Sequence, residues 1–161
     1  MSLHLRPATG DDEAFLQSVY ASTRLEELAL TRWDQSQCDA FIRMQFTAQR
    51  FYYENNFPGA EHLVIVSDGR PVGRLFIART QREIRILDIT VLPEHRSSGI
   101  GSAVVKGLLD ESRMTSKPVS IHVESFNRSL TLFNRLGFQR AATNGVHYLM
   151  EWNPSEDGVT G

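Results

Sequence analysis

The sequence holds a single cysteine, Cys38, among its 161 residues. One cysteine cannot form an internal disulfide, which fits a reducing compartment and predicts a cytoplasmic protein. No Cys–His arrangement suggests a nucleophile, so we expect a semi-buried helical thiol at this position. The five histidines are scattered and show no metal-ligand spacing such as H-E-x-x-H. The sequence therefore implies neither a disulfide framework nor a metal site.

Long apolar runs and an excess of one charge are also missing. No stretch approaches the roughly 18 consecutive apolar residues of a membrane span, and residues 1–7 alternate instead of forming a signal-peptide core. The net charge is −2, which gives no general attraction for nucleic acid or anionic lipid. We therefore expect no nucleic-acid partner and no membrane partner.

Internal repeats and interdomain linkers are absent as well. A chain of 161 residues suits one compact domain with a full core. We expect a single domain over residues 1–153. The polar segment 154–161, rich in Gly, Ser and Asp, is expected to be a disordered tail.

Alternating apolar residues and turn signals predict seven strands, at about residues 3–5, 62–67, 71–79, 84–92, 119–124, 138–143 and 146–152. Helical spacing and capping residues predict helices over about 9–21, 37–55, the stretch after Gly101 and 129–136, with a short helix or helical turn within 24–33. In the helix over 37–55, capped by Asp34 or Ser36, the apolar positions with helical spacing are Phe41, Met44, Thr47 and Phe51. This order predicts a mixed α/β domain, with an antiparallel meander, crossover helices and a terminal hairpin.

The most informative segment is residues 91–101, which read V-L-P-E-H-R-S-S-G-I-G. An apolar strand runs into a turn that contains Arg96, Gly99 and Gly101, and a helical pattern follows. The first amides of a helix have no internal partner, so they can donate to phosphate oxygens, and the helix dipole favours an anion there. Arg96 can pair with phosphate through its planar guanidinium. The segment therefore predicts a pyrophosphate cradle.

Two other phosphate-binding motifs are excluded for this segment. No P-loop string G-x-x-x-x-G-K-[ST] exists, and Val104 stands where a dinucleotide-binding fingerprint needs glycine. The remaining alternative is a glycine-rich turn that only permits tight packing between strand and helix.

Four segments together resemble the GCN5-related N-acetyltransferase (GNAT) superfamily along nearly the whole chain. The matching strings, in chain order, are L-R-P-A-T at 5–9, D-G-R-P-V-G at 68–73, the segment V-L-P-E-H-R-S-S-G-I-G at 91–101, and Asn127 followed by L-G-F at 136–138. The resemblance implies a GNAT-type fold: one central, mostly antiparallel, twisted sheet of about seven strands, splayed between the fourth and fifth strands and flanked by about four helices.

The resemblance also implies a cofactor and its binding residues. Members bind acetyl-CoA between the fourth and fifth strands, so the backbone of Ile89, Thr90 and Val91 is expected to pair with the pantetheine arm. The pyrophosphate is expected at Arg96 and at the amides of Ser97, Ser98, Gly99, Ile100, Gly101 and Ser102. Asn127 and Phe133 are expected near the thiol end of CoA. No metal is implied.

The reaction that follows is attack of an amine on the acetyl-CoA thioester. The strand amide near Val91 is placed to donate to the developing oxyanion. Strand alternation puts Asp88 on one face with Ile84 and Ile86, where partial desolvation raises the pKa of an acid toward the useful range. Asp88 is therefore the candidate base, and the alternative is that it only hydrogen-bonds a neighbouring loop.

The leaving thiolate presents a departure from the family pattern. The position of the usual tyrosine acid holds Phe133, which has no proton to give. Either the CoA thiolate leaves unassisted, since thiols have a modest pKa, or Ser129, one turn earlier on the same helical face, delivers a proton through water.

The acceptor side is expected between residues 21 and 59. Acids there can attract a cationic amine and aromatic side chains can wall a pocket, or these groups form an ordinary solvated face and core: Glu26, Glu27, Asp34, Tyr52, Tyr53 and Phe57. Glu124 is a further candidate catalytic residue, because Glu124 and His122 share one face of their strand while Ile121 and Val123 share the other.

The predicted function is an N-acetyltransferase acting on a small-molecule or peptide amine. The alternative is a non-catalytic acyl-CoA-binding module. A homodimer through the C-terminal strands is a further expectation.

Overall fold

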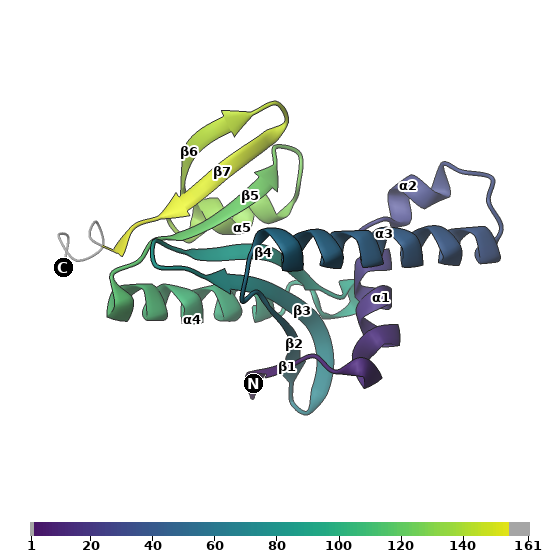
Figure 1. Cartoon of the computed structure of the whole chain (residues 1–161), viewed down its shortest axis with the longest axis horizontal. Coiled ribbons are helices and arrows are strands. Elements are labelled where there is room, and N and C mark those ends of the chain that lie inside the picture. The colour runs from purple at the N-terminus through teal and green to yellow at the C-terminus, as the bar shows by residue number, and fades with distance from the viewer. Residues whose placement is uncertain (1, 155–161) are drawn as a thin grey trace.

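The computed structural model describes residues 2–154, which form one seven-stranded sheet in the order β1-β2-β3-β4-β5-β7-β6 (Figure 1). Every neighbouring pair is antiparallel except β4 and β5, which run parallel. The strands are β1 Leu3–Pro7, β2 Glu61–Ser67, β3 Arg70–Arg79, β4 Ile84–Val91, β5 Val119–Glu124, β6 Gln139–Asn144 and β7 His147–Trp152. The predicted strands and the predicted GNAT-type sheet are therefore confirmed.

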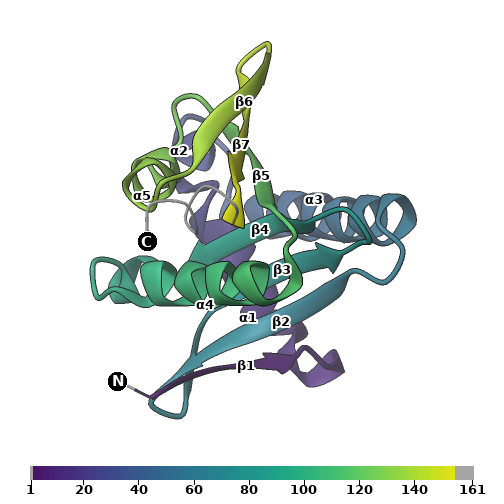
Figure 2. The same ribbon diagram turned by 90° about the vertical axis from the view of Figure 1, so that its left-hand side faces the viewer.

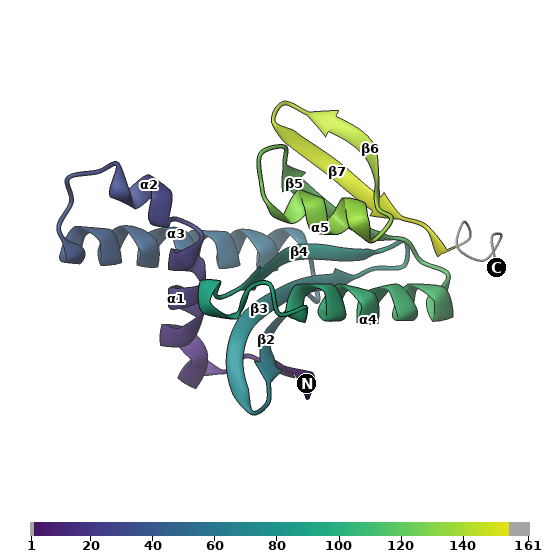
Figure 3. The ribbon, with the colours of Figure 1, turned by 180° about the vertical axis from the view of Figure 1, so that it is seen from behind.

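Five α-helices flank the sheet: α1 Glu13–Ser22, α2 Leu25–Ala29, α3 Gln35–Asn56, α4 Ile100–Thr115 and α5 Ser129–Arg135. The predicted count was about four, and the additional one is the short α2, for which a helix or a helical turn was expected. Helices α1 and α3 cover one face of the sheet, whereas α4 lies across the other (Figures 2 and 3). None of these helices is long and apolar enough to cross a membrane within residues 2–154.

Two hydrophobic clusters hold these layers together. The larger cluster joins α4 and α5 to the sheet and includes Ile86, Leu108 and Phe133. The smaller cluster joins α1 and α3 to β2, and it centres on Tyr20 and Phe46. Because each face of the sheet has its own core, the alternation of side chains along a strand decides which helix layer each residue meets.

The buried face of α3 differs from the predicted one. Asp34 caps the helix, as expected, and accepts from the Gln37 amide at 2.9 Å. The residues that reach the core, however, are Ile42 and Phe46, whereas Met44 and Phe51 are 62% and 68% exposed. Of the predicted stripe, Phe41 packs against the smaller cluster, whereas Met44, Thr47 and Phe51 lie on the outer surface because the helix meets the sheet through the neighbouring face.

Strands β4 and β5 stay paired over only three positions, from Ile84↔Val119 to Ile86↔Ile121. Beyond these pairs both strands continue, β4 to Val91 and β5 to Glu124, without hydrogen-bonding to each other. The expected splay is therefore present. Beyond it, the β5-facing edge of β4 carries backbone groups that no strand occupies.

A β-bulge in β4 changes which way Asp88 faces. Ile86 pairs with Ile77 and Asp88 pairs with Phe76, so Leu87 is an extra residue that shifts the alternation. Ile86 packs in the α4-side cluster, whereas Asp88 points to the α3 side. The expectation that Asp88 shares a face with Ile84 and Ile86 was wrong.

Both ends of the chain extend past the described residues. All seven strands of the described residues belong to one sheet, and the single domain over 1–153 stays a prediction. Apart from Pro154, the expected tail at 154–161 lies outside the described residues.

Candidate active-site groove

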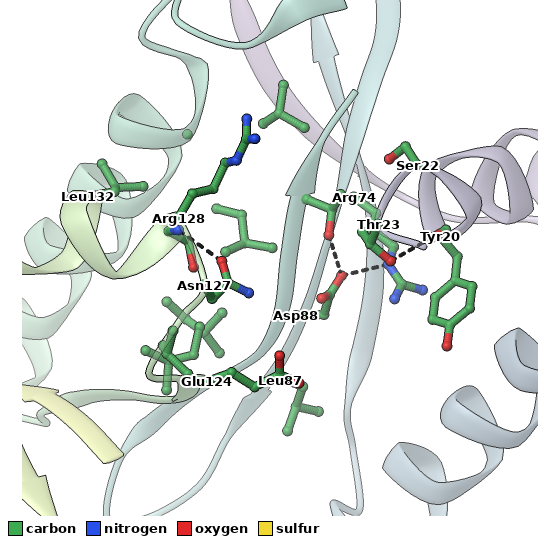
Figure 4. A pocket seen from close by; sticks show the side chains of 18 of the residues that line it. Tyr20, Ser22, Thr23, Arg74, Leu87, Asp88, Glu124, Asn127, Arg128 and Leu132 are labelled. Carbon is green, nitrogen blue, oxygen red and sulfur yellow. Dashed lines mark hydrogen bonds and ion pairs between the residues drawn. The ribbon is translucent and has the colours of Figure 1, made fainter. Parts of the chain in front are cut away.

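The splay between β4 and β5 opens into one large groove of about 1410 Å³. Its walls come from β4 and the loop before α4 on one side, and from β5 and α5 on the other, with α1, α2 and α3 closing one end (Figure 4). Most of the predicted site residues line it, including Asp88, Ile89, Thr90, Val91, Arg96, Ser97, Gly99, Ile100, Gly101, Ser102, Glu124, Asn127 and Ser129. The structure thus brings these residues together, although they come from distant parts of the sequence.

The loop before α4 has the backbone shape of an anion cradle. Ser97 and Gly99 adopt the left-handed region, with φ of 64° and 84°, and α4 begins directly afterwards at Ile100. A left-handed residue at the helix entry turns successive amides toward one side, where they can donate to a single anion. A Cβ built on Gly99 meets no atom within 4 Å, so the space in front of this turn is open.

Two arginines face this cradle without a carboxylate partner. Arg96 donates its Nε–H to the carbonyl of Val91 at 3.1 Å, which fixes its side chain at the end of β4. Arg128, from the turn into α5, extends toward the same end of the groove (Figure 4). Partial burial and the nearby charge of Arg128 lower the pKa of Arg96. No carboxylate forms an ion pair with either arginine within residues 2–154, so this end of the groove attracts anions.

Three further predicted residues have local structural contacts. The side-chain oxygen of Asn127 accepts from the Ser129 amide at 2.9 Å and so helps to begin α5. Ser98 points its hydroxyl back to the carbonyl of His95 and, unlike its neighbours in the loop, does not line the groove. Asn127 and Ser129 nevertheless line the groove, where a bound ligand can reach both side chains.

Phe133 is a core residue, which corrects its predicted place at the cofactor. Its side chain is fully buried, packs edge-on against Phe138 at 5.1 Å between ring centroids, and does not line the groove. The α5 residues that do line the groove are Thr131, Leu132 and Arg135, besides Ser129. Direct contact between Phe133 and a ligand would require the core to open.

On the other side of β4, Asp88 belongs to a buried polar network. Its Oδ2 accepts from Arg74 Nε at 2.7 Å and from the Thr90 hydroxyl at 3.0 Å (Figure 4). The Arg74 side chain is only 2% exposed, lies over the rings of Tyr20 and Phe46, and also donates to Gln49. These two donated bonds fix the orientation of the Asp88 carboxyl group, and the Arg74 guanidinium gives it a partner of opposite charge.

Glu124 reaches the same face of the sheet from β5. Ile121 and Val123 pack in the α4-side cluster, so His122 and Glu124 point to the α3 side, as the alternation predicted. His122 Nδ1 lies 3.2 Å from Arg85 Nη1, and partial burial together with that charge lowers the pKa of His122. A carboxylate therefore stands on each side of the splay, Asp88 on β4 and Glu124 on β5.

The aromatic residues of α3 close this end of the groove. Tyr52, Tyr53 and Phe57 all line it, as do Glu26 and Glu27, whereas Asp34 caps α3 and lies elsewhere. The Tyr53 hydroxyl donates to the carbonyl of Leu87, the bulge residue, at 3.0 Å. Burial and the nearby charge of Asp88 raise the pKa of Tyr53, so this phenol stays protonated and supports the bulge.

Sequence reasoning missed two residues of the site, Arg74 and Arg128. Arg74 lies in a strand between Gly73 and Leu75. The alternation of side chains along that strand predicts that Arg74 is exposed to solvent. Arg128 directly follows Asn127, and nothing in its own spacing distinguishes it from a surface arginine. Both are recognised only once β3, β4 and α5 are placed around the splay.

Comparison with known proteins gives a consistent picture of the fold. The model of the acetyltransferase (GNAT) family matches residues 25–138, which is most of the chain. No curated protein matches the sequence.

Several solved structures share the whole fold at low sequence identity. The PaiA N-acetyltransferase from Thermoplasma acidophilum, in complex with coenzyme A, superposes with a TM-score of 0.70 at 16% identity, covering 95% of this chain and 99% of the other. A putative acetyltransferase from Salmonella typhimurium with its cofactor acetyl-CoA gives 0.57 at 20% identity, covering 96% and 95%. The ribosomal-protein-S18-alanine N-acetyltransferase from Escherichia coli gives 0.61 at 14% identity, covering 94% of each chain.

Proposed function

The chain belongs to the acetyltransferase (GNAT) family, and from that premise we propose that it transfers an acetyl group from acetyl-CoA to a primary amine. The observation that carries the proposal is the combination of an unpaired β4 edge with a cradle at its end and two arginines that have no carboxylate partner within residues 2–154. An edge that accepts an extended amide chain and ends at an anion site matches the pantetheine and diphosphate of CoA.

The chain's own groups fit this ligand in sequence along the groove. The backbone of residues 89–91 offers donors and acceptors on the edge that faces β5. The amides that begin α4 and the guanidinium groups of Arg96 and Arg128 offer the positive end. Acetyl-CoA supplies the acetyl group as a thioester, in which the carbonyl carbon is open to attack by a neutral amine.

The transfer of the acetyl group requires one bond to form, one bond to break and one proton to move from the amine to the thiolate. The amine nitrogen forms a bond to the carbonyl carbon, the carbon–sulfur bond breaks, and the thiolate takes one proton, while the nitrogen loses one. Asp88 and Glu124 face the acceptor side of the splay and are the carboxylates placed to receive the amine proton, directly or through water. Ser129 lines the groove two residues after Asn127, which is expected near the thiol of CoA, so its hydroxyl is the candidate that gives a proton to the thiolate.

The proposal is tested by titrating the protein with acetyl-CoA in a calorimeter and then measuring release of free CoA thiol with a panel of amines. Binding together with amine-dependent thiol release supports the acetyltransferase. Tight binding without release of thiol across the panel would instead favour the acyl-CoA-binding module. Such an outcome would be consistent with residue 133, which is a buried phenylalanine and not a tyrosine that can protonate the thiolate. No binding of CoA or acetyl-CoA by folded protein would refute both.

A further inference from the structure

The charged side chains of the groove are sorted along its length. At the cradle end, Arg96, Arg128 and Arg135 line the groove, and none of them has a carboxylate partner within residues 2–154. At the acceptor end the groove is lined by three other arginines, and each of these is paired with an acid. The pairs are Arg24–Glu27 at 2.8 Å, Arg74–Asp88 at 2.7 Å and Arg85–Glu83 at 2.9 Å.

The arginines of the acceptor end have few donors to spare for a ligand. Arg24 also donates to the Tyr20 hydroxyl, and Arg85 also donates to the Ser120 hydroxyl and lies against His122. Arg74 is almost fully buried behind Asp88. A carboxylate entering this end would therefore meet only guanidinium groups whose charge an acid already balances.

Carboxylate groups, by contrast, remain unused at the acceptor end. Glu124 is 40% exposed, and its one ion-pair contact among residues 2–154 is His147 Nε2 at 4.0 Å, the outer limit of such a contact, with a ring that is charged only when it is protonated. Glu26 lines the groove without an ion-pair partner in the described part of the chain. Asp88 uses only its Oδ2 in the bonds to Arg74 and Thr90, so its second oxygen is left for a ligand.

These unused oxygens lie where the acceptor must enter. The bulge at Leu87 turns Asp88 to the α3 side, and the alternation of β5 turns Glu124 to the same side. One carboxylate thus stands on each strand at the mouth of the splay (Figure 4). The side chains of Tyr52 and Phe57 line the same end, and they offer aromatic surface to an apolar stem or to an ammonium group.

We propose that the acceptor is a cationic amine without a carboxylate group, bound with its ammonium head between Glu124 and Asp88 and its stem against Tyr52 and Phe57. This inference rests on the proposed acetyltransferase function and adds the class of its substrate. Free amino acids and other amine-bearing acids are excluded, because at this end of the groove their carboxylate meets other carboxylates and, among the described residues, no arginine without an acid partner. Juxtaposed like charges lower the affinity for such a ligand by about tenfold or more.

Matched amines test this charge selection. We would measure kcat/KM for thiol release with butylamine, putrescine and γ-aminobutyrate, which differ in the charge at the far end of one short chain. Tyramine and tyrosine form a second set that differs by a carboxylate. The expected order places putrescine and butylamine above γ-aminobutyrate, and tyramine above tyrosine, by about tenfold or more. Acids used as well as their matched amines would overturn the proposal.

Glu124 supplies the residue-specific arm of the experiment. Glu124→Gln should narrow the tyramine-to-tyrosine ratio to within about threefold, since one unpaired negative charge is removed at the mouth of the splay. Glu54→Gln, which removes an exposed carboxylate of α3 outside the groove, is the matched control and should leave the ratio unchanged. An unchanged ratio in Glu124→Gln would show that Glu124 does not select the acceptor.

Binding measurements separate this inference from the function on which it rests. Titration with CoA alone comes first, and a failure there would refute the proposed function itself. Tyramine and tyrosine are then titrated into the CoA-loaded protein, which needs no turnover. Preferential binding of tyramine supports the acceptor class even if no acetyl group is transferred, whereas equal binding of the two overturns it.

Discussion

Arg74 and Asp88 form an unequal ion pair, in which the arginine side chain is 2% exposed and the aspartate side chain is 23% exposed. The Nε–Oδ2 distance is 2.7 Å, and within residues 2–154 the arginine has no other charged partner and its buried Nη1 has no acceptor. A guanidinium remains charged at any ordinary pH, so this buried positive charge depends on the carboxyl group of Asp88 as its partner. Asp88 therefore has a structural duty besides any role in chemistry.

The two partners should differ in their effect on stability. Asp88→Asn leaves a buried, uncompensated charge and should lower the free energy of unfolding by about 3 kcal/mol. Arg74→Met removes the buried charge and leaves an aspartate that water can reach, so it should cost less. The double variant should be more stable than Asp88→Asn alone. Urea unfolding of the four proteins measures this cycle, and equal losses in the two single variants would contradict the unequal pair.

The cradle end should depend on Arg128 as well as on Arg96. Arg128→Gln should raise the Kd for acetyl-CoA by about three- to tenfold, because a hydrogen bond to a charged group contributes roughly 1.5–3 kcal/mol before solvent screening. Arg140→Gln is the control, since the Arg140 guanidinium lies over the Tyr148 ring on the terminal hairpin, 4.6 Å from its centroid. The measurement is calorimetric titration at two salt concentrations. A smaller salt dependence in Arg128→Gln than in the control would identify the lost phosphate contact.

The sequence predicts the elements of this fold better than the faces they bury. Turn signals and caps located the seven strands and the four longer helices, because these depend on neighbouring residues. The buried stripe of α3 was assigned to Met44 and Phe51 because they have helical spacing, but Ile42 and Phe46 have it too. Which stripe is buried depends on how the helix docks on β2, and that contact is not local.

In the candidate site, too, the local features could be predicted from the sequence and the non-local ones could not. The cradle at residues 96–102 could be predicted because glycines, an arginine and a helix start lie within one short segment. The direction of Asp88 could not, because the bulge at Leu87 depends on how β4 pairs with β3. The splay itself was expected only through the family resemblance, since strand periodicity carries no information about where two strands part.

Two glycines at different places should respond in opposite ways to the same substitution. A Cβ on Gly73 would lie 2.2 Å from the carbonyl oxygen of Thr90, so Gly73→Ala forces β3 and β4 apart. We expect a loss of about 2–3 kcal/mol, the upper range for overpacking. Gly107→Ala, on α4 with no atom near its Cβ, should instead stabilise by about 0.5–1 kcal/mol. Thermal unfolding compares them directly. A neutral Gly73→Ala would show that the two strands can separate at little cost.

Adding a phenol at residue 133 should not supply a general acid. Phe133 is fully buried against Phe138, so the new hydroxyl of Phe133→Tyr would lack a partner and cost about 1–3 kcal/mol of stability. We expect no gain in the rate of thiol release at saturating acetyl-CoA. A rate rising by tenfold or more would mean that the ring reaches the groove. Ser129→Ala, measured alongside, separates a proton delivered by the α5 hydroxyl from unassisted departure of the thiolate.

His62 should make the protein less stable as the pH falls from 7 toward 5. The ring stacks on Phe76 at 4.5 Å between centroids, and its buried Nε2 finds no hydrogen-bond partner in the described part of the chain. Burial, with the charges of Arg74 and Arg50, lowers the pKa of His62 from 6.5 to about 4. The unfolded chain therefore binds a proton in this range that the folded chain does not, and stability falls as the pH drops from 6.5 toward 4.

His62→Phe isolates this effect, because phenylalanine suits a site between Phe46 and Phe76 and cannot be protonated. Between pH 7 and pH 5 the natural chain should lose about 2 kcal/mol more than the variant, as measured by urea unfolding at each pH. His122, whose pKa is also lowered, contributes in the same direction, so His122→Gln serves as the comparison. The salt-bridged carboxyls Asp12 and Glu13, whose pKa values are lowered, add their own loss only below this window. Parallel pH profiles for the natural chain and His62→Phe would show that His62 accepts a proton without unfolding.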